Sequence, residues 1–408
     1  MNAPPGGESL RIAIFAESYL PYVSGVTVST ESLARGLRAA GHEVLLVAPR
    51  PARGVPPGSA GAPGPDPELA WLPSFQLPRP APRGYRVPWP IPSSALRAAV
   101  AFRPDIVHAQ SPFVSGLMAR RVARRAGVPL VFTHHTRLGD YRHYLGPLAA
   151  PGAAAVSAYL GRFWAGCAAI VAPGTDLGDE ITAQLRVGRH PAVRVIPTGI
   201  DTGSIGGLEP IDARPAAGWP PDAVVAVSVG RLAPEKSTEP VVEAFAAAVA
   251  EEPTLRLLLI GGGPLEVALR RRVARSDLAG RVHLTGALPR LEALALARGA
   301  DLFVFASQTE TQGLVLAEAL AAGLPVVAVD GHGVRDSVRD GIDGEVLTAA
   351  PDETRPARLA AAIVGLARDS ARRAALAEAA AEGATRFDAA TRIIEMVDLY
   401  RSLLPQRR

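Results

Sequence analysis

The chain has 408 residues, of which 48% are hydrophobic and 20% are charged. This composition is typical of a globular protein rather than a disordered one, and the length suits two domains better than one. The single cysteine, Cys167, excludes an internal disulfide framework and a cysteine-rich metal site.

No uncharged run is long enough to span a bilayer, and the apolar run 12–16 is too short for a signal peptide, so we expect a cytoplasmic protein. Charge is divided unevenly. Residues 1–205 hold 20 basic and 12 acidic side chains, a net charge of +8, whereas residues 206–408 have a net charge of −4. A basic first half predicts an anionic ligand or surface there, with an uneven solvated surface as the alternative.

The first elements form a β-loop-α-β unit of the Rossmann type. Residues 11–16 and 43–48 are expected as strands, and residues 27–40 as the helix between them. The unit lacks the G-x-G-x-x-G pattern, which argues against a dinucleotide cofactor. Gly25, followed by Val26 at the end of the first loop, can let backbone approach a ligand phosphate, or it is a plain turn glycine.

Two further strands of the first half are expected at 104–108 and 129–133, followed by Gln110 and by His134-His135-Thr136-Arg137. Ligands in open α/β sheets lie beyond the carboxyl ends of the strands. We therefore interpret His135 as an acid, base or polar group in a cleft, with a satisfied structural histidine as the alternative. No further ligand set with metal spacing is near it.

Three segments of the first half are informative in other ways. Residues 50–66 are rich in proline, glycine and alanine, which predicts a mobile loop. Residues 118–126 form a helix with four arginines, either a solvated face or one that binds anionic lipid headgroups at roughly 1 kcal/mol per charge. Residues 141–168 are helical and apolar, which indicates core or a membrane-facing element.

A second series of strands and helices begins after residues 203–222, whose glycines and prolines suit a hinge. Residues 223–229 are expected as its first strand, and Arg231 and Lys236 lie in the loop that follows. Lys236 is the only lysine in the sequence. Alternating strands and helices on both sides of the hinge predict two doubly wound α/β domains. The last helix, about 387–403, is far from the second set of strands in sequence and can cross back to the first domain.

The stretch 307–319 is the centre of the second half. A buried strand at 302–306 precedes it, and a helix begins after Gly313. Free backbone amides at a helix start can receive an anion, helped by the helix dipole. Glu310 and Glu318 flank this point and would repel phosphate, so we expect them to bind hydroxyl groups on either side of it. The alternative is a strand–loop–helix unit with two solvated acids.

These residues, with Gly25 and His135, closely resemble glycosyltransferase family 4. The resemblance covers nearly the whole chain, and its most specific part is Arg231 and Lys236 combined with the spacing of Glu310 and Glu318. It implies the GT-B fold, an α/β architecture of two Rossmann-like doubly wound domains that face a central cleft.

The expected domain boundaries follow from the hinge. The first domain spans residues 1–202 and is completed by the C-terminal helix at 387–408. Residues 203–222 are the hinge, and residues 223–386 form the domain that binds the nucleotide-sugar.

The resemblance also implies roles for the donor-binding residues. A nucleotide-diphosphate hexose, such as UDP-glucose or UDP-galactose, is the expected donor, and Arg231 and Lys236 would neutralise its diphosphate leaving group. Glu318 would hold the ribose, Glu310 the sugar hydroxyls, and His135 would contact the transferred sugar. Stabilisation of the departing negative charge is the main catalytic contribution, with retention of anomeric configuration.

Further hydrogen bonds to the donor are expected from a set of loop residues that share exposed backbone amides or polar side chains. These are Gly25, Val26, Gln312, Gly313, Leu314 and Val315. One departure from the family pattern is Ser24, where many relatives have a second glycine. The sequence contains no Asp-x-Asp, and two cations can replace a metal ion on the diphosphate, so no metal or other cofactor is expected.

Within the family, the residues Thr-Glu-Thr-Gln-Gly at 309–313 resemble the bacterial enzymes that glucosylate diacylglycerol. His108, Gln110 and Arg137 add to this likeness and are assigned to the acceptor side. The implied acceptor is 1,2-diacylglycerol. The implied location is peripheral on the inner face of the cell membrane, with the basic first domain against an anionic surface. No nucleic acid partner is expected.

Three alternatives stay open at this point. The first is the same donor chemistry on phosphatidylinositol, a soluble sugar or a polysaccharide precursor. The second is a nucleotide-sugar isomerase of the same fold, which needs no acceptor. The third is a sugar-nucleotide-binding regulator without turnover, which the joint presence of both acids, both cations and His135 disfavours.

Overall fold

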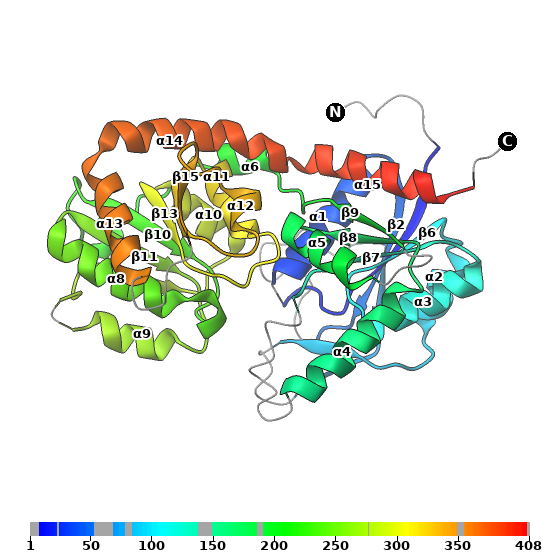
Figure 1. Cartoon of the computed structure of the whole chain (residues 1–408). Coiled ribbons are helices and arrows are strands. Elements are labelled where there is room, and N and C mark those ends of the chain that lie inside the picture. The colour runs from blue at the N-terminus through cyan, green and yellow to red at the C-terminus, as the bar shows by residue number, and fades with distance from the viewer. Residues whose placement is uncertain are drawn as a thin grey trace. The chain divides into compact units, whose positions relative to one another are not determined.

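The computed structural model describes residues 8–22, 24–52, 68–77, 84–137, 149–185, 191–275, 277–348 and 355–405. The chain divides into two compact units, one made of residues 1–199 with 389–408 and the other of residues 200–388. Each unit contains a parallel β-sheet with helices packed on both of its faces (Figure 1). The two expected doubly wound α/β domains are therefore present. Most of the proline-rich loop expected at 50–66 lies outside the described residues.

The first unit is built on a seven-stranded sheet in the order β3-β2-β1-β6-β7-β8-β9, with every pairing parallel. Its strands are β1 Arg11–Phe15, β2 Glu43–Pro49, β3 Leu69–Leu72, β6 Ile106–Ala109, β7 Leu130–Thr133, β8 Ala169–Ala172 and β9 Ala192–Val195. Its helices are α1 Gly25–Ala39, α2 Ser94–Ala101, α3 Val114–Ala126, α4 Ala149–Trp164, α5 Thr175–Gln184 and α15 Ala389–Leu403. A small antiparallel hairpin, β4 Ser74–Gln76 with β5 Arg86–Pro88, adds to it.

Alternate residues of the first strand point into two different hydrophobic layers. Ala13 and Phe15 pack in the layer that includes α2, α3, α4 and α5. Ile12 and Ile14 pack in the layer with α1 and α15, where Tyr400 is fully buried. The last helix therefore forms part of the core of the first unit.

The second unit has a six-stranded parallel sheet in the order β12-β11-β10-β13-β14-β15. Its strands are β10 Val224–Val229, β11 Leu255–Ile260, β12 Val282–Gly286, β13 Leu302–Phe305, β14 Val326–Val329 and β15 Gly344–Leu347. Its helices are α6 Thr202–Gly206, α7 Arg214–Ala217, η2 Pro234–Lys236, α8 Thr238–Glu251, α9 Glu266–Val273, α10 Arg290–Arg298, α11 Leu314–Ala321, α12 Val334–Ser337, α13 Arg355–Arg368, α14 Ser370–Gly383 and η3 Ala384–Phe387.

Three local expectations differ from the structure. The segment 203–222, interpreted as a hinge, contributes Ile205, Ala213 and Trp219 to a core layer of the second unit, because its apolar side chains pack there. The first helix begins at Gly25 rather than at 27, because Ser24 adopts an extended conformation and its side chain caps the helix. The apolar helix expected at 141–168 is described as α4, Ala149–Trp164, and its expected first residues lie outside the described part.

No helix in the described ranges of the chain is both long enough and apolar enough to cross a membrane.

Candidate active site

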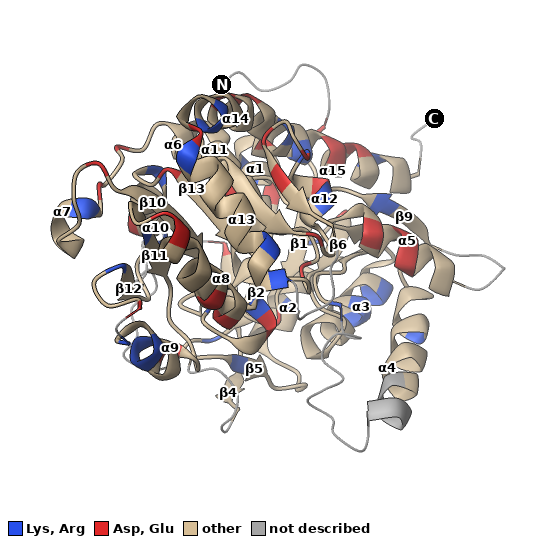
Figure 2. Cartoon of the chain, turned by 60° about the vertical axis from the view of Figure 1, so that its left-hand side comes forward, with Lys and Arg blue, Asp and Glu red and all other residues tan. Residues whose placement is uncertain are grey.

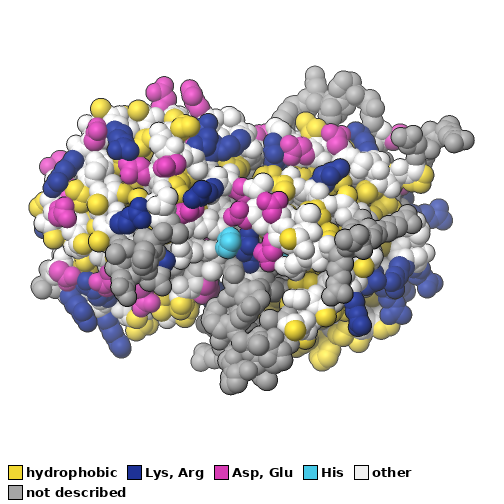
Figure 3. Space-filling view, viewed as in Figure 1, with side chains coloured by type: hydrophobic (Ala, Val, Ile, Leu, Met, Phe, Trp, Pro, Cys, Tyr) yellow, Lys and Arg dark blue, Asp and Glu magenta, His cyan; other side chains and the backbone are white. Residues whose placement is uncertain are grey.

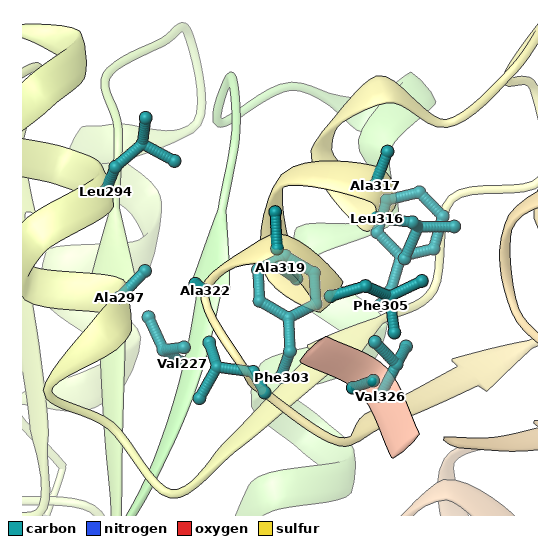
Figure 4. Packing of buried hydrophobic residues seen from close by; sticks show 14 of the residues in the cluster. Val227, Leu294, Ala297, Phe303, Phe305, Leu316, Ala317, Ala319, Ala322 and Val326 are labelled. Atoms are coloured by element: carbon teal, nitrogen blue, oxygen red, sulfur yellow. The ribbon is translucent and has the colours of Figure 1, made fainter. Parts of the chain in front are cut away.

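The loop between β13 and α11 is held by the packing of the helix that follows it. Leu316 and Ala317 of α11 lie against Phe305 of β13, in a buried layer that also includes Phe303 (Figure 4). Gly313 precedes the helix with φ of 73°, a left-handed conformation that favours glycine, and no side chain caps the helix start. The amides of Leu316 and Ala317 donate to the Gly313 carbonyl at 2.8 and 3.4 Å. That the amides before them receive an anion stays a prediction.

A glycine turn that the sequence analysis did not single out supports this loop from the β14 side. The side-chain amide of Gln308 donates to the carbonyl of Asp330 at 3.3 Å, and the Ser337 hydroxyl donates to the carbonyl of Gln312 at 2.7 Å. Gly333 has φ of 73°, and a Cβ there would lie 2.9 Å from the Gln312 carbonyl carbon. Only glycine fits at 333 without displacing the loop that carries Glu310.

Lys236 and Glu310 lie together, as expected from their predicted roles on one ligand. Lys236 ends the short helix η2 after β10, and its Nζ donates to Oε1 of Glu310 at 2.6 Å. The hydroxyls of Ser307 and Thr309 both donate to the carbonyl of Glu235, at 3.3 and 3.0 Å. The loops after β10 and β13 are thus joined by three contacts at the carboxyl ends of adjacent strands.

Arg231 lies in the same loop and is about half exposed. Its Nη1 is 3.4 Å from Oε1 of Glu235, and the Arg231 side chain keeps 48% of its surface exposed. A partly exposed guanidinium beside a weakly held carboxylate can turn towards an incoming anion at small cost. This position fits the role of a diphosphate ligand better than that of a fixed structural cation.

Glu318 has a partner that the sequence analysis missed. Arg290, the first residue of α10, donates to Oε1 of Glu318 from Nε at 3.0 Å and from Nη2 at 2.5 Å. Both bonds go to one oxygen, and Oε2 has no bond in this pair. A cation in the first turn of a helix opposes the helix dipole, and this is the sequence signal that could have marked Arg290.

In the first unit, Gln110 and His135 come together at the carboxyl ends of β6 and β7. Oε1 of Gln110 is 2.7 Å from Nε2 of His135. Burial, with a smaller contribution from His134, lowers the pKa of His135 to about 3, so the ring is neutral at pH 7. With the amide oxygen facing the ring, Nε2 carries the proton and Nδ1 keeps a lone pair that can accept a hydrogen bond.

The assignment of His108 to the acceptor side does not fit the structure. His108 is fully buried, and its Nδ1 and Nε2 bond the hydroxyls of Tyr400 and Thr133 at 2.6 and 2.7 Å. The physical reason is its position on β6, a strand in the middle of the sheet and covered by α15. Both ring nitrogens are occupied, so His108 stabilises the core of the first unit.

Arg137, which was assigned to the acceptor side, is largely buried. Its side chain is 6% exposed, and Nη1 donates to Oε2 of Glu180 at 2.6 Å. Its Nε and Nη2 have no hydrogen-bond partner within the described part of the chain. These two buried donors can still bind a polar group that reaches this edge of the sheet.

A buried acid, Glu17, follows β1 at the same edge and was not predicted as a functional residue. Its Oε2 accepts a hydrogen bond from the backbone amide of Ser115 in the first turn of α3 at 2.7 Å. Burial raises the pKa of Glu17, while the hydrogen bonds to Ser115 oppose that shift. An acid placed directly after a strand is the sequence signal for this position.

Gly25 opens α1 and is exposed at this end of the first unit. A Cβ added at Gly25 would meet no atom within 4 Å, so the space beside it is open. Val26 is the next residue of the helix, and its carbonyl accepts a bond from Thr30 at 2.8 Å. The Ser24 side chain takes the amide of Thr27, but the room beside Gly25 suits the expected approach of an anion.

Across the described ranges, no three or more histidine, cysteine, aspartate or glutamate side chains are grouped so that they could hold a metal ion. The expectation of a metal-free site stays a prediction.

The fold defines a class: a glycosyltransferase of two α/β domains. The chain belongs to glycosyltransferase family 4. The model of Glycosyltransferase Family 4 matches residues 23–204, and the model of Glycosyl transferases group 1 matches residues 211–383.

The sequence is similar to several glycosyltransferases over most of its length. The alpha-monoglucosyldiacylglycerol synthase of Acholeplasma laidlawii is 32% identical over 328 residues, covering 78% of this chain and 80% of that protein. The GDP-mannose-dependent alpha-mannosyltransferase of Mycolicibacterium smegmatis is 34% identical over 332 residues, covering 81% and 82%.

Solved structures show the same fold. Anabaena HepE, crystallised in complex with UDP and glucose, is 20% identical with a TM-score of 0.70, covering 97% of this chain and 100% of that one. Sucrose-phosphate synthase of Thermosynechococcus elongatus is 22% identical with a TM-score of 0.72, covering 97% and 99%. The GT-B fold expected from the sequence is confirmed.

Proposed function

We propose that this glycosyltransferase moves a hexose from a nucleotide-diphosphate sugar to a lipid acceptor, with 1,2-diacylglycerol as acceptor and an α-glycosyl glycolipid as product. UDP-glucose and UDP-galactose are the proposed donors. The observation that carries the donor part is the arrangement around the start of α11. Two acids, Glu310 and Glu318, flank a helix start that no side chain of the described residues caps, and each acid is held by a cation, Lys236 or Arg290.

The proposed chemistry follows from this arrangement. The α11 amides and Arg231 receive the diphosphate, and Lys236 turns from Glu310 towards it when the donor binds. Glu310 is then released to accept hydrogen bonds from the sugar hydroxyls, while Arg290 keeps Glu318 in place for the ribose. Stabilisation of the departing diphosphate is the main contribution to rate.

His135 is proposed to contact the transferred sugar through Nδ1, which is unprotonated in the neutral tautomer set by Gln110. Retention of configuration by attack from the leaving-group side completes the proposal, because the sequence shows no well-placed enzyme nucleophile. No step needs a metal ion, since cationic side chains offset the diphosphate charge.

Two observations support a lipid acceptor and an anionic membrane surface. The relatives from Acholeplasma laidlawii and Streptococcus pneumoniae are named alpha-monoglucosyldiacylglycerol synthases. In this chain, Phe113 precedes α3 and Leu117 lies within it, and they are 43% and 48% exposed. The sequence of α3 contains four arginines and no acid. An apolar and basic helix face fits a peripheral location at a membrane with anionic lipids.

A second candidate donor is GDP-mannose. The 34% identical relative is a GDP-mannose-dependent alpha-mannosyltransferase, and other relatives are named D-inositol 3-phosphate glycosyltransferases. A test of both candidates is a panel of radiolabelled UDP- and GDP-sugars against diacylglycerol, phosphatidylinositol and soluble sugars. Transfer from UDP-glucose or UDP-galactose to diacylglycerol in organic extracts supports the first proposal. Transfer only from GDP-mannose, or only into the aqueous phase, contradicts it.

A further inference from the structure

A cavity of about 340 Å³ lies in the first unit where α3 and α4 end. It is lined by Arg120, Ala123 and Arg124 of α3, by Val128 and Leu130, and by the segment 165–168 that follows α4. This is the edge of the sheet where β7 and β8 begin, whereas Gln110 and His135 follow the ends of β6 and β7. The cavity is therefore separate from the candidate active site. Its volume is in the range of small-molecule sites.

The cavity has unbalanced positive charge. Neither Arg120 nor Arg124 has an acidic partner within the described ranges, and neither α3 nor α4 contains an acidic residue. Arg120 donates from Nη1 to the carbonyl of Arg162 at 3.3 Å, and its Nε is buried without a hydrogen-bond partner there. A buried donor without an acceptor is costly, so this guanidinium is poised to bind one.

Gly166 leaves the room that the Arg120 guanidinium occupies. A Cβ at 166 would lie 2.6 Å from Cζ of Arg120. The neighbouring Cys167 adds no negative charge, because burial raises the pKa of its thiol to about 12. Each helix end contributes roughly half a negative charge, and the two full guanidinium charges outweigh this. The cavity therefore favours an anion.

We propose that this cavity binds a phosphate group carried as a mono- or diester, with Arg120 and Arg124 as its ligands. A planar guanidinium matches the oxygens of phosphate and forms charge-assisted hydrogen bonds with them. The volume leaves room for a glycerol or similar group on the phosphate.

The surroundings favour the headgroup of an anionic phospholipid over a free phosphate ester as the source. Arg121 and Arg125 are exposed on α3 beside the cavity, and Phe113 and Leu117 are exposed towards the other end of this helix. Figure 2 shows basic side chains on α3, in contrast to the acidic ones on α5. In Figure 3, basic side chains gather at the right-hand edge, over α2 and α3, with hydrophobic side chains over α4 below them.

The test compares two double variants of the full-length chain that lose the same charge from the same helix. Arg120→Gln with Arg124→Gln removes the cavity cations, and Arg121→Gln with Arg125→Gln removes exposed arginines that do not line the cavity. Partition to phosphatidylglycerol vesicles and to phosphatidylcholine vesicles is measured by sedimentation at one ionic strength. We expect the cavity pair to weaken binding to phosphatidylglycerol at least about tenfold more than the control pair does. Equal losses in the two variants mean diffuse attraction alone and exclude a lipid headgroup; together with no cavity-dependent stabilisation by phosphate esters, they overturn the proposal.

A third variant, Ala165→Leu, keeps every charge but adds bulk to the lining of the cavity, and it guards against misfolding of the arginine variants. Circular dichroism and thermal unfolding verify that it folds. Its binding to phosphatidylglycerol should fall about as far as that of the cavity pair, and unchanged binding contradicts the proposal.

A second experiment, with soluble phosphate compounds, identifies the source of the phosphate. Thermal unfolding is followed with glycerol 3-phosphate or inorganic phosphate against sodium chloride of equal ionic strength. Stabilisation by millimolar phosphate ester that is lost in the cavity pair assigns the site to a soluble ligand. A loss seen only with vesicles assigns it to a lipid headgroup. None of these measurements needs sugar transfer, so failure of the proposed function and failure of this site are distinguishable.

Discussion

Nζ of Lys236 lies 2.6 Å from Oε1 of Glu310, and the two residues come from loops at the ends of adjacent strands, β10 and β13. The cation expected to bind the diphosphate and the acid expected to bind the sugar therefore neutralise each other. In the proposed reaction, donor binding exchanges this ion pair for two new sets of contacts, so each partner depends on the other.

The first prediction concerns this pair. Glu310→Ala and Lys236→Ala should each lower kcat/KM by at least about 100-fold, because each removes a charge-assisted contact to the transition state. Initial rates of sugar transfer measure this, with circular dichroism as the control for folding. Near-normal rates in either variant would remove the residue from the proposed site. Glu310→Gln should be less damaging than Glu310→Ala, since an amide can still bind a sugar hydroxyl.

The second prediction concerns Arg290 as a positioning residue for Glu318. Arg290→Gln removes both bonds to Oε1 of Glu318, and the carboxylate is then free to leave the position proposed for ribose binding. We expect KM for the donor and the Kd for free UDP to rise about tenfold, with a smaller change in kcat. Titration calorimetry with UDP measures this effect. Arg270→Gln, which breaks an exposed pair with Glu266, is the matched control and should leave UDP binding unchanged.

The third prediction concerns Gly333. Gly333→Ala should cost about 1–2 kcal/mol for its left-handed backbone and more for the contact with the Gln312 backbone. Gly341→Ala is the control, because its φ is 72° and its added Cβ meets nothing within 4 Å. Both variants should lose stability in urea unfolding, and only Gly333→Ala should also weaken UDP binding. Equal UDP affinity in the two variants would show that the turn at Gly333 does not support the donor-binding loop.

The fourth prediction concerns metal dependence. Activity of the purified enzyme should survive excess chelator, since the proposed diphosphate ligands are Arg231, Lys236 and backbone amides of α11. Transfer rates with and without EDTA test this. Complete loss with EDTA, followed by recovery with a divalent ion, would contradict the metal-free mechanism.

The fifth prediction concerns acid stability. Burial lowers the pKa of His108 to about 3 and that of His134 to about 4, below the unfolded value near 6.5. Both rings are neutral in the folded state, so stability is full above pH 6.5 and decreases as the pH falls towards 4. Each contributes a slope of up to about 1.4 kcal/mol per pH unit. The pKa of Glu17 is raised in the folded state, so its protonation adds stability as the pH falls. This opposes the loss from the histidines only in the pH range where Glu17 itself titrates.

Urea unfolding between pH 7 and 5 measures that slope. His108→Gln should be less stable at pH 7, because the bonds to Tyr400 and Thr133 are altered. The free energy of unfolding of this variant should also depend less steeply on pH, by up to about 1.4 kcal/mol per pH unit. An unchanged slope would mean that His108 does not contribute to acid sensitivity.

The sequence was most informative where spacing reports chemistry directly. The strand pattern predicted two doubly wound domains. The spacing of Glu310 and Glu318, combined with Lys236, predicted one ligand site, and Lys236 and Glu310 do lie in contact. Contacts between side chains that are distant in the sequence could not be predicted from it. The Arg290–Glu318 pair, the Gln110–His135 bond and the burial of His108 under α15 depend on which strands are neighbours, and the order β1-β6-β7 cannot be read from local pattern. Helix starts also depended on capping, as Ser24 shows.

The return of α15 to the first unit has a consequence for biosynthesis. Residues 1–199 leave the ribosome long before Tyr400, which closes the layer around Ile12 and Ile14 and bonds His108. The second unit is synthesised whole in between, as one continuous segment. We therefore expect the second unit to fold first during translation. Until α15 is synthesised, the apolar face of the first unit that it covers stays exposed. Fragments meant to isolate the first unit should carry residues 389–405 joined to 1–199.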